Sequence, residues 1–348
     1  MSGRLRLAPM FLIVVVLAVA VALHLSPSGA GSPGEPTSAP AVGGVAITVG
    51  NMDRSIEFYS TVLFFEKVSD VQTSGPEIER LFGVAGARVR VVTLRLGAER
   101  LELVEYLAPR GRAIPADTRS NDRWFQHIAI VVNDMDQAYL WLRRHGVSGT
   151  SPAPQQLPDW NPTEGIRAFS FKDTDGHALE LLQFPPDKGD PRWQRPSDRV
   201  FLGIDHAAIV VGDTEASLRF YRDRLGLQIV GARGTEGPEH DGPINIPGAR
   251  LRITTLRAAV GPAIELLEYL APRDGRAYPR DTKGNDLARW HTLLVTPDVD
   301  TIVGRLAESK ARSARPTVVS TGGAPLGFRR GLTTEDPDGH GVQLRAMK

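Results

Sequence analysis

The sequence predicts an α+β fold made of four strand–helix–strands units that are arranged in two pairs. Two observations support this prediction. The second half of the chain repeats the first half, and each half contains two apolar strands that are each followed by a short amphipathic helix. A chain of 348 residues, 41% of them hydrophobic, is long enough to form two domains.

The repeat is visible in three pairs of segments, and the two members of a pair lie roughly 163 residues apart. The pairs are residues 56–59 (IEFY) and 218–221 (LRFY), 87–95 (ARVRVVTLR) and 249–257 (ARLRITTLR), and 101–110 (LELVEYLAPR) and 264–273 (IELLEYLAPR). We therefore predict one domain at residues 43–185 and a second domain at residues 203–348. Residues 186–202 are polar and rich in proline, which is typical of a linker.

The first unit of the first domain opens with an apolar strand at residues 45–49. Ile56, Tyr59 and Leu63 follow at a spacing that places them on one face of a helix. Alternating strands come next, and they end in the strand that contains Glu102.

The second unit has the same plan. A strand is expected at residues 128–132, followed by a helix that is capped near Asp134 and ends at Gly146. A turn at residues 173–176 (DTDG) then leads into a last strand at residues 178–184.

The second domain repeats these elements. A strand is expected at residues 207–211, and Leu218, Tyr221 and Leu225 form the buried face of the next helix. A turn at residues 336–339 (DPDG) leads into the last strand at residues 341–345.

The N-terminus has the features of a secretory signal. Arg4 and Arg6 precede an apolar run at residues 10–23, and small residues follow up to Ala30. We predict a signal segment at residues 1–30, cleaved after Ala30, and a flexible tether at residues 31–42. The protein is then exported, either to the periplasm or out of the cell. The alternative is that an uncleaved segment anchors it to the membrane.

Composition excludes several classes of function. The chain has 41 Lys and Arg against 40 Asp and Glu, so no excess of positive charge indicates binding to nucleic acid. It contains no cysteine, which excludes disulfides and thiolate ligands. Any metal site must therefore use histidine and carboxylate ligands, which suit Zn, Ni, Fe, Mn or Co.

Several motifs together resemble those of the vicinal oxygen chelate superfamily: a strand that opens near a histidine, a helix that ends in Phe-Tyr, a strand with Glu-Leu, and a last hairpin of the DPDGH type. This superfamily includes glyoxalase I, methylmalonyl-CoA epimerase, extradiol dioxygenases, and the bleomycin and fosfomycin resistance proteins. The resemblance covers nearly everything after residue 42. It implies βαβββ modules, paired into cupped mixed sheets with helices outside, in two glyoxalase-like domains. It does not specify the reaction, because one fold hosts many chemistries.

The resemblance also implies positions for metal ligands, at the start of the first strand and inside the last strand of each module. In module order, these positions hold Gly44 and Glu102, His127 and Glu180, His206 and Glu265, and His291 and Gln343. Two of them depart from the family, because Gly44 has no donor and Gln343 offers only a neutral amide oxygen. In the strand of Glu102, strand alternation points Glu105 to the opposite face, so only one of the two enters the cup.

The pairing of the modules decides which site is complete. Sequential pairing would leave one defect in each site. Exchanged pairing, as in two-domain glyoxalase I enzymes, would place His127, Glu180, His206 and Glu265 in one complete metal site. The second, degenerate site would then hold Glu102, His291 and Gln343. We favour the exchanged arrangement, because it concentrates both losses in one cavity.

Other residues receive structural interpretations. We expect His177 and His340 to lie at the surface in the hairpin turns, and Trp124 and Trp290 to pack in the core or at a rim. The arginines of the loops, Arg112, Arg123, Arg276 and Arg289, are expected to be solvated rather than to bind an anionic substrate.

The leading hypothesis for function is a metal-dependent enzyme of the glyoxalase–epimerase type. A metal-stabilised enediolate would form on a small oxygenated metabolite, with Glu180 or Glu265 as the catalytic base and acid. An extradiol-type dioxygenase is the second hypothesis, although the longer signature of that branch is absent. A non-catalytic protein that binds a small molecule, like the resistance proteins, is the third. No nucleic-acid partner is expected, and the membrane is a partner only through an uncleaved N-terminal segment.

Overall fold

The computed structural model describes residues 40–157, 165–235, 246, 248–307, 317–321 and 326–347. The predicted signal segment and nearly all of the predicted tether lie outside these residues. Ala41 and Val42, which were assigned to the tether, belong instead to the first strand. None of the helices in the described part of the chain is long and apolar enough to cross a membrane.

Two eight-stranded sheets form the framework of the protein. Sheet A has the strand order β14-β15-β16-β13-β1-β4-β3-β2, and sheet B has the order β10-β11-β12-β9-β5-β8-β7-β6. The strands of sheet A are β1 (Ala41–Thr48), β2 (Glu66–Ser74), β3 (Arg88–Leu96), β4 (Glu99–Ala108), β13 (Trp290–Val295), β14 (Val319–Ser320), β15 (Arg330–Glu335) and β16 (Gly341–Ala346). The strands of sheet B are β5 (Gln126–Val132), β6 (Gln155–Gln156), β7 (Arg167–Lys172), β8 (Ala178–Gln183), β9 (Phe201–Val211), β10 (Gln228–Thr235), β11 (Arg250–Arg257) and β12 (Ala263–Ala271).

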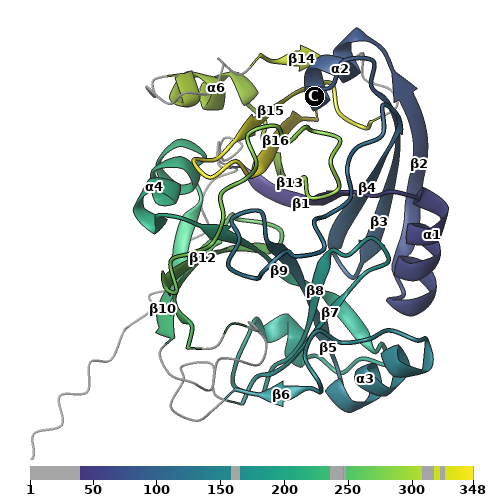
Figure 1. Ribbon diagram of the computed structural model, residues 1–348, viewed down its shortest axis with the longest axis vertical. Helices are drawn as coiled ribbons and strands as arrows, with labels where there is room; N and C mark the ends of the chain where they lie inside the picture. The colour runs from purple at the N-terminus through teal and green to yellow at the C-terminus, as the bar shows by residue number, and fades with distance from the viewer. Residues whose placement is uncertain are drawn as a thin grey trace, which may run out of the picture. The chain divides into compact units, whose positions relative to one another are not determined.

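Each sheet contains strands from both sequence repeats. Sheet A joins the first module to the fourth through the antiparallel pair of β1 and β13. Sheet B joins the second module to the third through the antiparallel pair of β5 and β9. The exchanged pairing is therefore the one that the protein adopts. In Figure 1 the strands of sheet A occupy the upper half of the molecule and those of sheet B the lower half.

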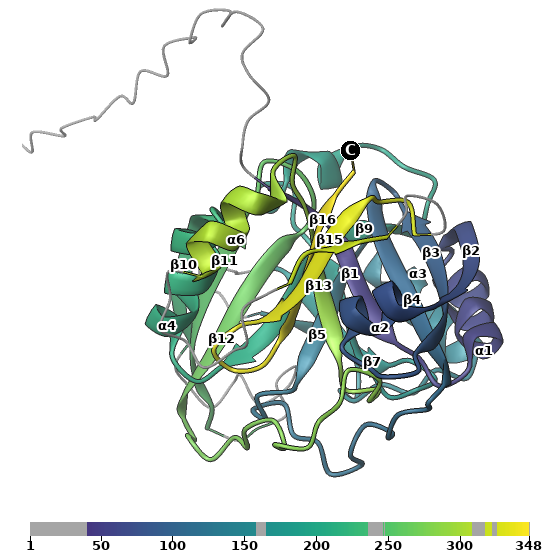
Figure 2. The ribbon, with the colours of Figure 1, turned by 90° about the horizontal axis from the view of Figure 1, so that it is seen from above.

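The helices pack against the outer faces of the sheets, as predicted for this α+β fold. They are α1 (Met52–Glu57) with the π-helical turn η1 (Phe58–Val62), α2 (Pro76–Phe82), α3 (Met135–Arg144), α4 (Thr214–Leu218) with η3 (Arg219–Arg224), and α6 (Val299–Ala307). The short 3-10 helix η2 (Pro191–Gln194) lies in the linker. Figure 2 shows α4 beside α6 on one side of the strands and α1 on the other side.

Helical spacing correctly identified the residues that anchor these helices. Tyr59 and Leu63 of the first module are fully buried, in one core cluster with Met135 and Leu142 of α3. The first helix is capped by Asn51, whose side chain accepts a hydrogen bond from the backbone of Arg54. This core cluster contains residues of both sheets, so burial of one set of side chains joins the two repeats.

The prediction that His177 and His340 lie at the surface is wrong. Both side chains are buried, because each folds back under its hairpin onto the first aspartate of the turn. His177 Nδ1 lies 2.8 Å from Asp173 Oδ2, and His340 Nδ1 lies 2.9 Å from Asp336 Oδ2. Residue types that favour turns indicate where the backbone is exposed, but they do not determine where the histidine ring is placed.

Candidate metal centre

The register of sheet B places the four residues of the predicted complete site on one face. His127 pairs with Ala208 and with Ala178, while Glu265 also pairs with Ala208. His206 and Glu180 each lie two residues from one of these partners along the strand. Because side chains alternate along a strand, all four point into the same cup. They come from four adjacent strands: β12, β9, β5 and β8.

The four side chains also lie close together. His127 Nε2 is 3.5 Å from Glu180 Oε2, and His206 Nε2 is 3.5 Å from Glu265 Oε2. The centres of the two imidazole rings are 5.6 Å apart. One donor atom from each of His127, Glu180 and His206 lies within 4.8 Å of the others. The geometry thus brings together two pairs of donors from different sequence repeats.

Asp205 orients the second histidine. Its Oδ2 lies 3.0 Å from His206 Nδ1, and its Oδ1 accepts a hydrogen bond of 3.1 Å from the indole of Trp193. With Nδ1 held in this way, Nε2 of His206 faces the centre of the cup. Carboxylates that hold a metal-binding histidine from behind commonly play this role. The sequence analysis missed Asp205, although its position directly before His206 was a signal for it.

The charges around His206 favour its protonated form when no cation is present. Burial lowers the pKa of His206, but the negative charges of Glu265 and Asp205 outweigh it and raise the pKa to about 9. The Asp205 carboxyl is affected in the opposite sense. Burial raises its pKa, but the opposite effect of His206, Trp193 and Arg257 is larger and lowers the pKa to about 2. The cup therefore stabilises positive charge at its centre.

Glu265 is the more tightly held of the two carboxylates. Thr255 Oγ1 donates a hydrogen bond of 2.9 Å to it, and the guanidinium of Arg233 lies 3.3 Å from Oε1. Burial raises the pKa of Glu265, but His206 and Arg233 lower it below its usual value. Glu180 has a different environment, because His127 Nε2 lies 3.5 Å from its Oε2 and a ring nitrogen of His206 lies within 4.8 Å of the same carboxylate.

The donor set fits a divalent transition metal. Two imidazoles and two carboxylates provide hard and intermediate ligands without sulfur. His127 Nε2 is buried and has no hydrogen-bond partner among the described residues. A buried nitrogen with no partner is costly, and a cation at the centre of the cup would satisfy it.

A cavity of about 550 Å³ is lined by His127 and Glu180, two of these four residues. Its walls are mostly apolar and include Trp124 and Trp290, which are both buried. Asn121 contributes a buried side-chain oxygen that has no partner within the described part of the chain. A mainly apolar cavity with a few polar groups is typical of a small-molecule site.

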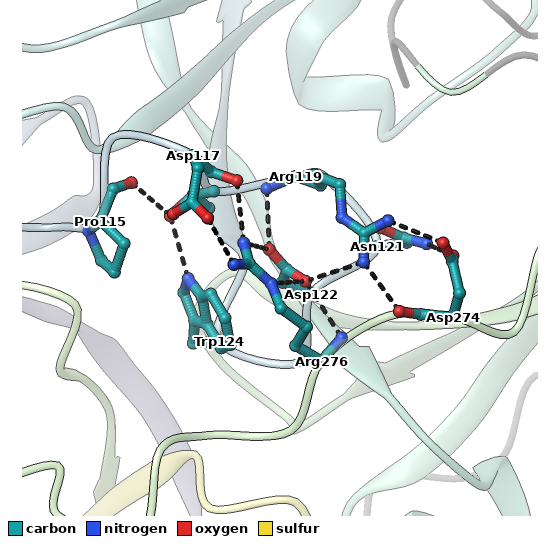
Figure 3. A network of polar contacts seen from close by, with 9 residues as sticks. Pro115, Asp117, Arg119, Asn121, Asp122, Trp124, Asp274 and Arg276 are labelled. Atoms are coloured by element: carbon teal, nitrogen blue, oxygen red, sulfur yellow. Dashed lines mark hydrogen bonds and ion pairs between the residues drawn. The ribbon is translucent and has the colours of Figure 1, made fainter.

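The loop arginines form ion pairs rather than being solvated alone. Arg276 donates to Asp122 and Asp117, and Arg119 donates to Asp274, so each pair links the two sequence repeats (Figure 3). Arg112 makes the equivalent contacts with Asp286 and Asp281. Arg123 also pairs across the repeats, with Asp338, whereas Arg289 pairs with Glu335 within the second repeat. These contacts hold the loops at the mouths of the two cups.

The predicted degenerate site also lies on one face of its sheet. Glu102 pairs with Ala46, Ala46 with His291, and His291 with Gly341, two residues before Gln343. Its centre, however, contains the side chain of Arg345, which the sequence analysis did not identify. Arg345 donates two hydrogen bonds of 2.6 and 2.7 Å to Glu102 and one of 2.7 Å to Gln343.

His291 is kept neutral in this second cup. Burial, together with the positive charges of Arg289 and Arg345, lowers its pKa to about 3. Gly44 lies next to a register shift in β1 and has φ +140. A Cβ atom there would lie 2.3 Å from the carbonyl oxygen of Arg100. The backbone therefore requires glycine at the position where the other modules carry a histidine.

Comparisons with known proteins agree with the fold. The model of the family described as "Glyoxalase/Bleomycin resistance protein/Dioxygenase superfamily" matches residues 41–181 and again residues 203–344. A 2-epi-5-epi-valiolone epimerase from an Actinomyces species is 34% identical over 179 residues, which are 50% of this chain and 92% of that protein. A lactoylglutathione lyase from Arabidopsis thaliana is 25% identical over 244 residues, which are 70% of this chain and 72% of that protein.

Solved structures show the same fold. Glyoxalase I from Zea mays superposes with a TM-score of 0.59 at 19% identity, over 89% of this chain and 93% of that chain. A putative dioxygenase from Bacillus subtilis superposes with a TM-score of 0.54 at 14% identity, over 88% of this chain and 84% of that chain. At these identities the likeness extends to the fold and not to the reaction.

Proposed function

We propose that this chain, which belongs to the Glyoxalase/Bleomycin resistance protein/Dioxygenase superfamily, is an exported metal-dependent lyase or isomerase that acts on a small oxygenated metabolite. The observation that carries this proposal is the convergence of His127, Glu180, His206 and Glu265 in the cup of sheet B. The two histidines and two carboxylates would hold the ion. When bound, a divalent ion would supply Lewis-acid polarisation of a substrate carbonyl.

Glu180 is the residue that we assign to proton transfer. Its carboxylate lies at the wall of the cavity, and its nearest charged neighbours are the imidazoles of His127 and His206 rather than an arginine. It is therefore free to take a proton from a carbon beside a carbonyl group and return it. Glu265 is less suited to this task, because Arg233 and Thr255 hold its oxygens and its lowered pKa makes it a weaker base.

The cavity favours a small substrate with several oxygen atoms. Its volume of about 550 Å³ accommodates a small metabolite, and its apolar walls carry isolated polar groups such as Asn121 and Gln126. An epimerase and a lyase are among the relatives of this chain. An exported enzyme would not meet the glutathione or coenzyme A conjugates of the cytosol, so we propose a free carbonyl compound as the substrate class.

The test is exchange of a substrate proton with solvent. Candidate hydroxyketones are incubated in D2O with the metal-loaded protein, and deuterium incorporation is followed by NMR. Glu180→Gln is expected to slow exchange by about 100-fold or more, and metal content is measured in the same samples so that loss of the ion is not mistaken for loss of the base. Glu268→Gln is the control, because Glu268 lies on the same strand as Glu265 but on the opposite face. Equal rates in Glu180→Gln and the wild type would refute the assignment.

An extradiol-type dioxygenase is the second candidate, favoured by one observation. His127, Glu180 and His206 form a group of two histidines and one carboxylate, which is the ligand set of many non-haem iron oxygenases. Ring cleavage of catechols by the Fe(II)-loaded protein would be visible as a new absorbance. Absence of this absorbance with several catechols would exclude the dioxygenase reaction for those substrates.

Export is part of the proposal and rests on the sequence. Arg4, Arg6 and the apolar run at residues 10–23 support a secretory signal. Fractionation of cells that produce the full chain would test it. A mature product beginning near residue 31 outside the cytoplasm supports export with cleavage, a full-length product in the membrane fraction supports the anchored alternative, and a full-length cytosolic product contradicts both.

A further inference from the structure

We propose that the guanidinium of Arg345 takes the place of the divalent ion in the cup of sheet A, so that each chain holds one ion and not two. The inference that one ion is held in sheet B rests on the proposed function. The role of Arg345 in sheet A rests on its own contacts and can be tested separately.

The contacts of Arg345 are those of a ligand that is bound at the centre of a site. Two of its nitrogens donate to the two oxygens of Glu102 at 2.6 and 2.7 Å, which is a bidentate ion pair. Its Nε donates to the side-chain oxygen of Gln343 at 2.7 Å. All three side chains are buried. Two of the three residues implied as metal ligands in this cup are thus committed to the guanidinium.

The register explains how Arg345 reaches this position. It lies two residues after Gln343 on β16, and therefore on the same face of sheet A. In sheet B the equivalent strand is β8, where Glu180 corresponds to Gln343 and Leu182 corresponds to Arg345. The cup of sheet B therefore has no arginine at this position, and its centre is left to the histidines and carboxylates.

The charges of the two cups are consistent with the substitution. The sheet B cup has two carboxylates, Glu180 and Glu265. Arg233 contacts Glu265 at 3.3 and 3.5 Å, which is longer than the contacts of Arg345 with Glu102. The sheet A cup has one carboxylate, Glu102, and one permanent positive charge on Arg345. Because Gln343 stands where a second carboxylate would be, the single negative charge of Glu102 is balanced by the single positive charge of Arg345. The amide oxygen of Gln343 still accepts a hydrogen bond from Nε of Arg345. A divalent ion added beside Arg345 would bring positive charges together in a buried site.

Metal stoichiometry tests the first consequence. The protein is stripped with chelator, reloaded with Zn²⁺ alone, desalted, and analysed by native mass spectrometry. One ion per chain is expected for the wild type, and none for the His127→Ala/His206→Ala double variant. Two ions in the wild type, or one ion that survives in the double variant, would overturn the inference.

Stability measurements test the pair itself without any dependence on activity. Arg345→Leu introduces the residue found at the equivalent position of sheet B and leaves Glu102 buried without its partner. We expect the Tm of the metal-free protein to fall by about 5–10 °C. Glu102→Gln in the same chain should recover most of this loss, because it removes the unpaired charge.

Added Zn²⁺ provides the second arm of this experiment. In Arg345→Leu, Glu102 and His291 become available, so we expect one additional ion per chain and a partial recovery of Tm. Neither effect is expected in the Arg345→Leu/Glu102→Gln double variant. Arg95→Leu, which removes an exposed arginine paired with Glu66, is the matched control and should change neither value.

The outcomes separate the two proposals. A wild-type protein that binds no ion, together with a loss of Tm in Arg345→Leu that Glu102→Gln recovers, would refute the proposed function and retain the pair. An Arg345→Leu variant with unchanged Tm and no additional ion would refute the role of Arg345, whatever the sheet B cup binds.

Discussion

At the scale of single residues, the face of the strand on which a carboxylate lies determines whether it enters a cup. Glu105 and Glu268 lie three residues after Glu102 and Glu265 and point to the other face. There they accept hydrogen bonds from the backbone of Met52 and Thr214 at the starts of two helices. Strand alternation alone therefore distinguished the carboxylates of the cups from those that hold helices.

Asp205 provides a prediction at this scale. Asp205→Asn weakens the interaction that fixes Nδ1 of His206, so Nε2 is less well oriented and less basic. We expect a loss of about 10- to 100-fold in Zn²⁺ affinity, measured by competition with a chromogenic chelator. Asp213→Asn, at the cap of α4, is the control for a change of similar chemistry on the same repeat. Unchanged affinity in Asp205→Asn would show that the aspartate does not support the metal site.

At the scale of elements, local patterns predicted most of the strands and helices, while contacts between distant elements escaped prediction. Tyr59 and Tyr221 were assigned to buried helix faces from their spacing, and both are fully buried. Their hydroxyl groups donate to Asp173 and Asp336, which lie more than a hundred residues away in the hairpin turns. No local signal in the sequence identifies such a partner.

The same limitation explains why neither the position of Arg345 nor the burial of His340 was predicted. The partner of Arg345 is 243 residues away in the sequence, because β16 and β4 come together only through the exchanged pairing. The burial of His340 likewise depends on a distant residue, Tyr278, whose ring lies against its imidazole. The family resemblance supplied positions for ligands, but it could not show that an arginine occupies one of the two centres.

The hairpin pair of Asp336 and His340 predicts a dependence of stability on pH. Burial lowers the pKa of His340, but Asp336 raises it more, to a value above 6.5. Burial raises the pKa of Asp336, but His340 lowers it more, to a value below 3.8. The stability that protonated His340 contributes is fully present below pH 6.5 and is lost as the pH rises through its raised pKa. The stability that ionised Asp336 contributes is present above pH 3.8 and is lost as the pH falls through its lowered pKa.

We therefore expect the pair to stabilise the fold most between about pH 4 and 6.5. Asp336→Asn should lower Tm by about 5 °C in this range, and by less at higher pH. Thermal unfolding of both proteins between pH 4 and 9 provides the measurement. A difference in Tm that stays constant across this interval would mean that His340 is not charged in the folded protein.

At the scale of the whole molecule, the exchange of modules makes each cup a product of both repeats. His127 and Glu180 come from the first repeat, and His206 and Glu265 from the second. The main core cluster likewise contains residues of both repeats, and the arginine–aspartate pairs join their loops. The duplication could be predicted from the sequence, but the partner of each module could only be ranked, because both pairings bury the same kind of apolar strand.

This arrangement predicts that neither repeat binds the ion alone. Residues 40–189 and 190–348 are produced separately and titrated with Zn²⁺, and neither is expected to show the affinity of the whole chain. Coexpression of the two halves should restore a complex that binds one ion. High-affinity binding by the first half alone, measured as a monomer, would contradict a site built from both repeats.

We propose above that four side chains hold one divalent ion in the cup of sheet B. Anomalous diffraction from crystals of the Zn²⁺-loaded protein, collected at the zinc edge, tests it most directly. We expect a single peak among His127, Glu180, His206 and Glu265, and continuous density for Arg345 against Glu102. A peak between Glu102 and His291, or no peak in the cup of sheet B, would contradict it.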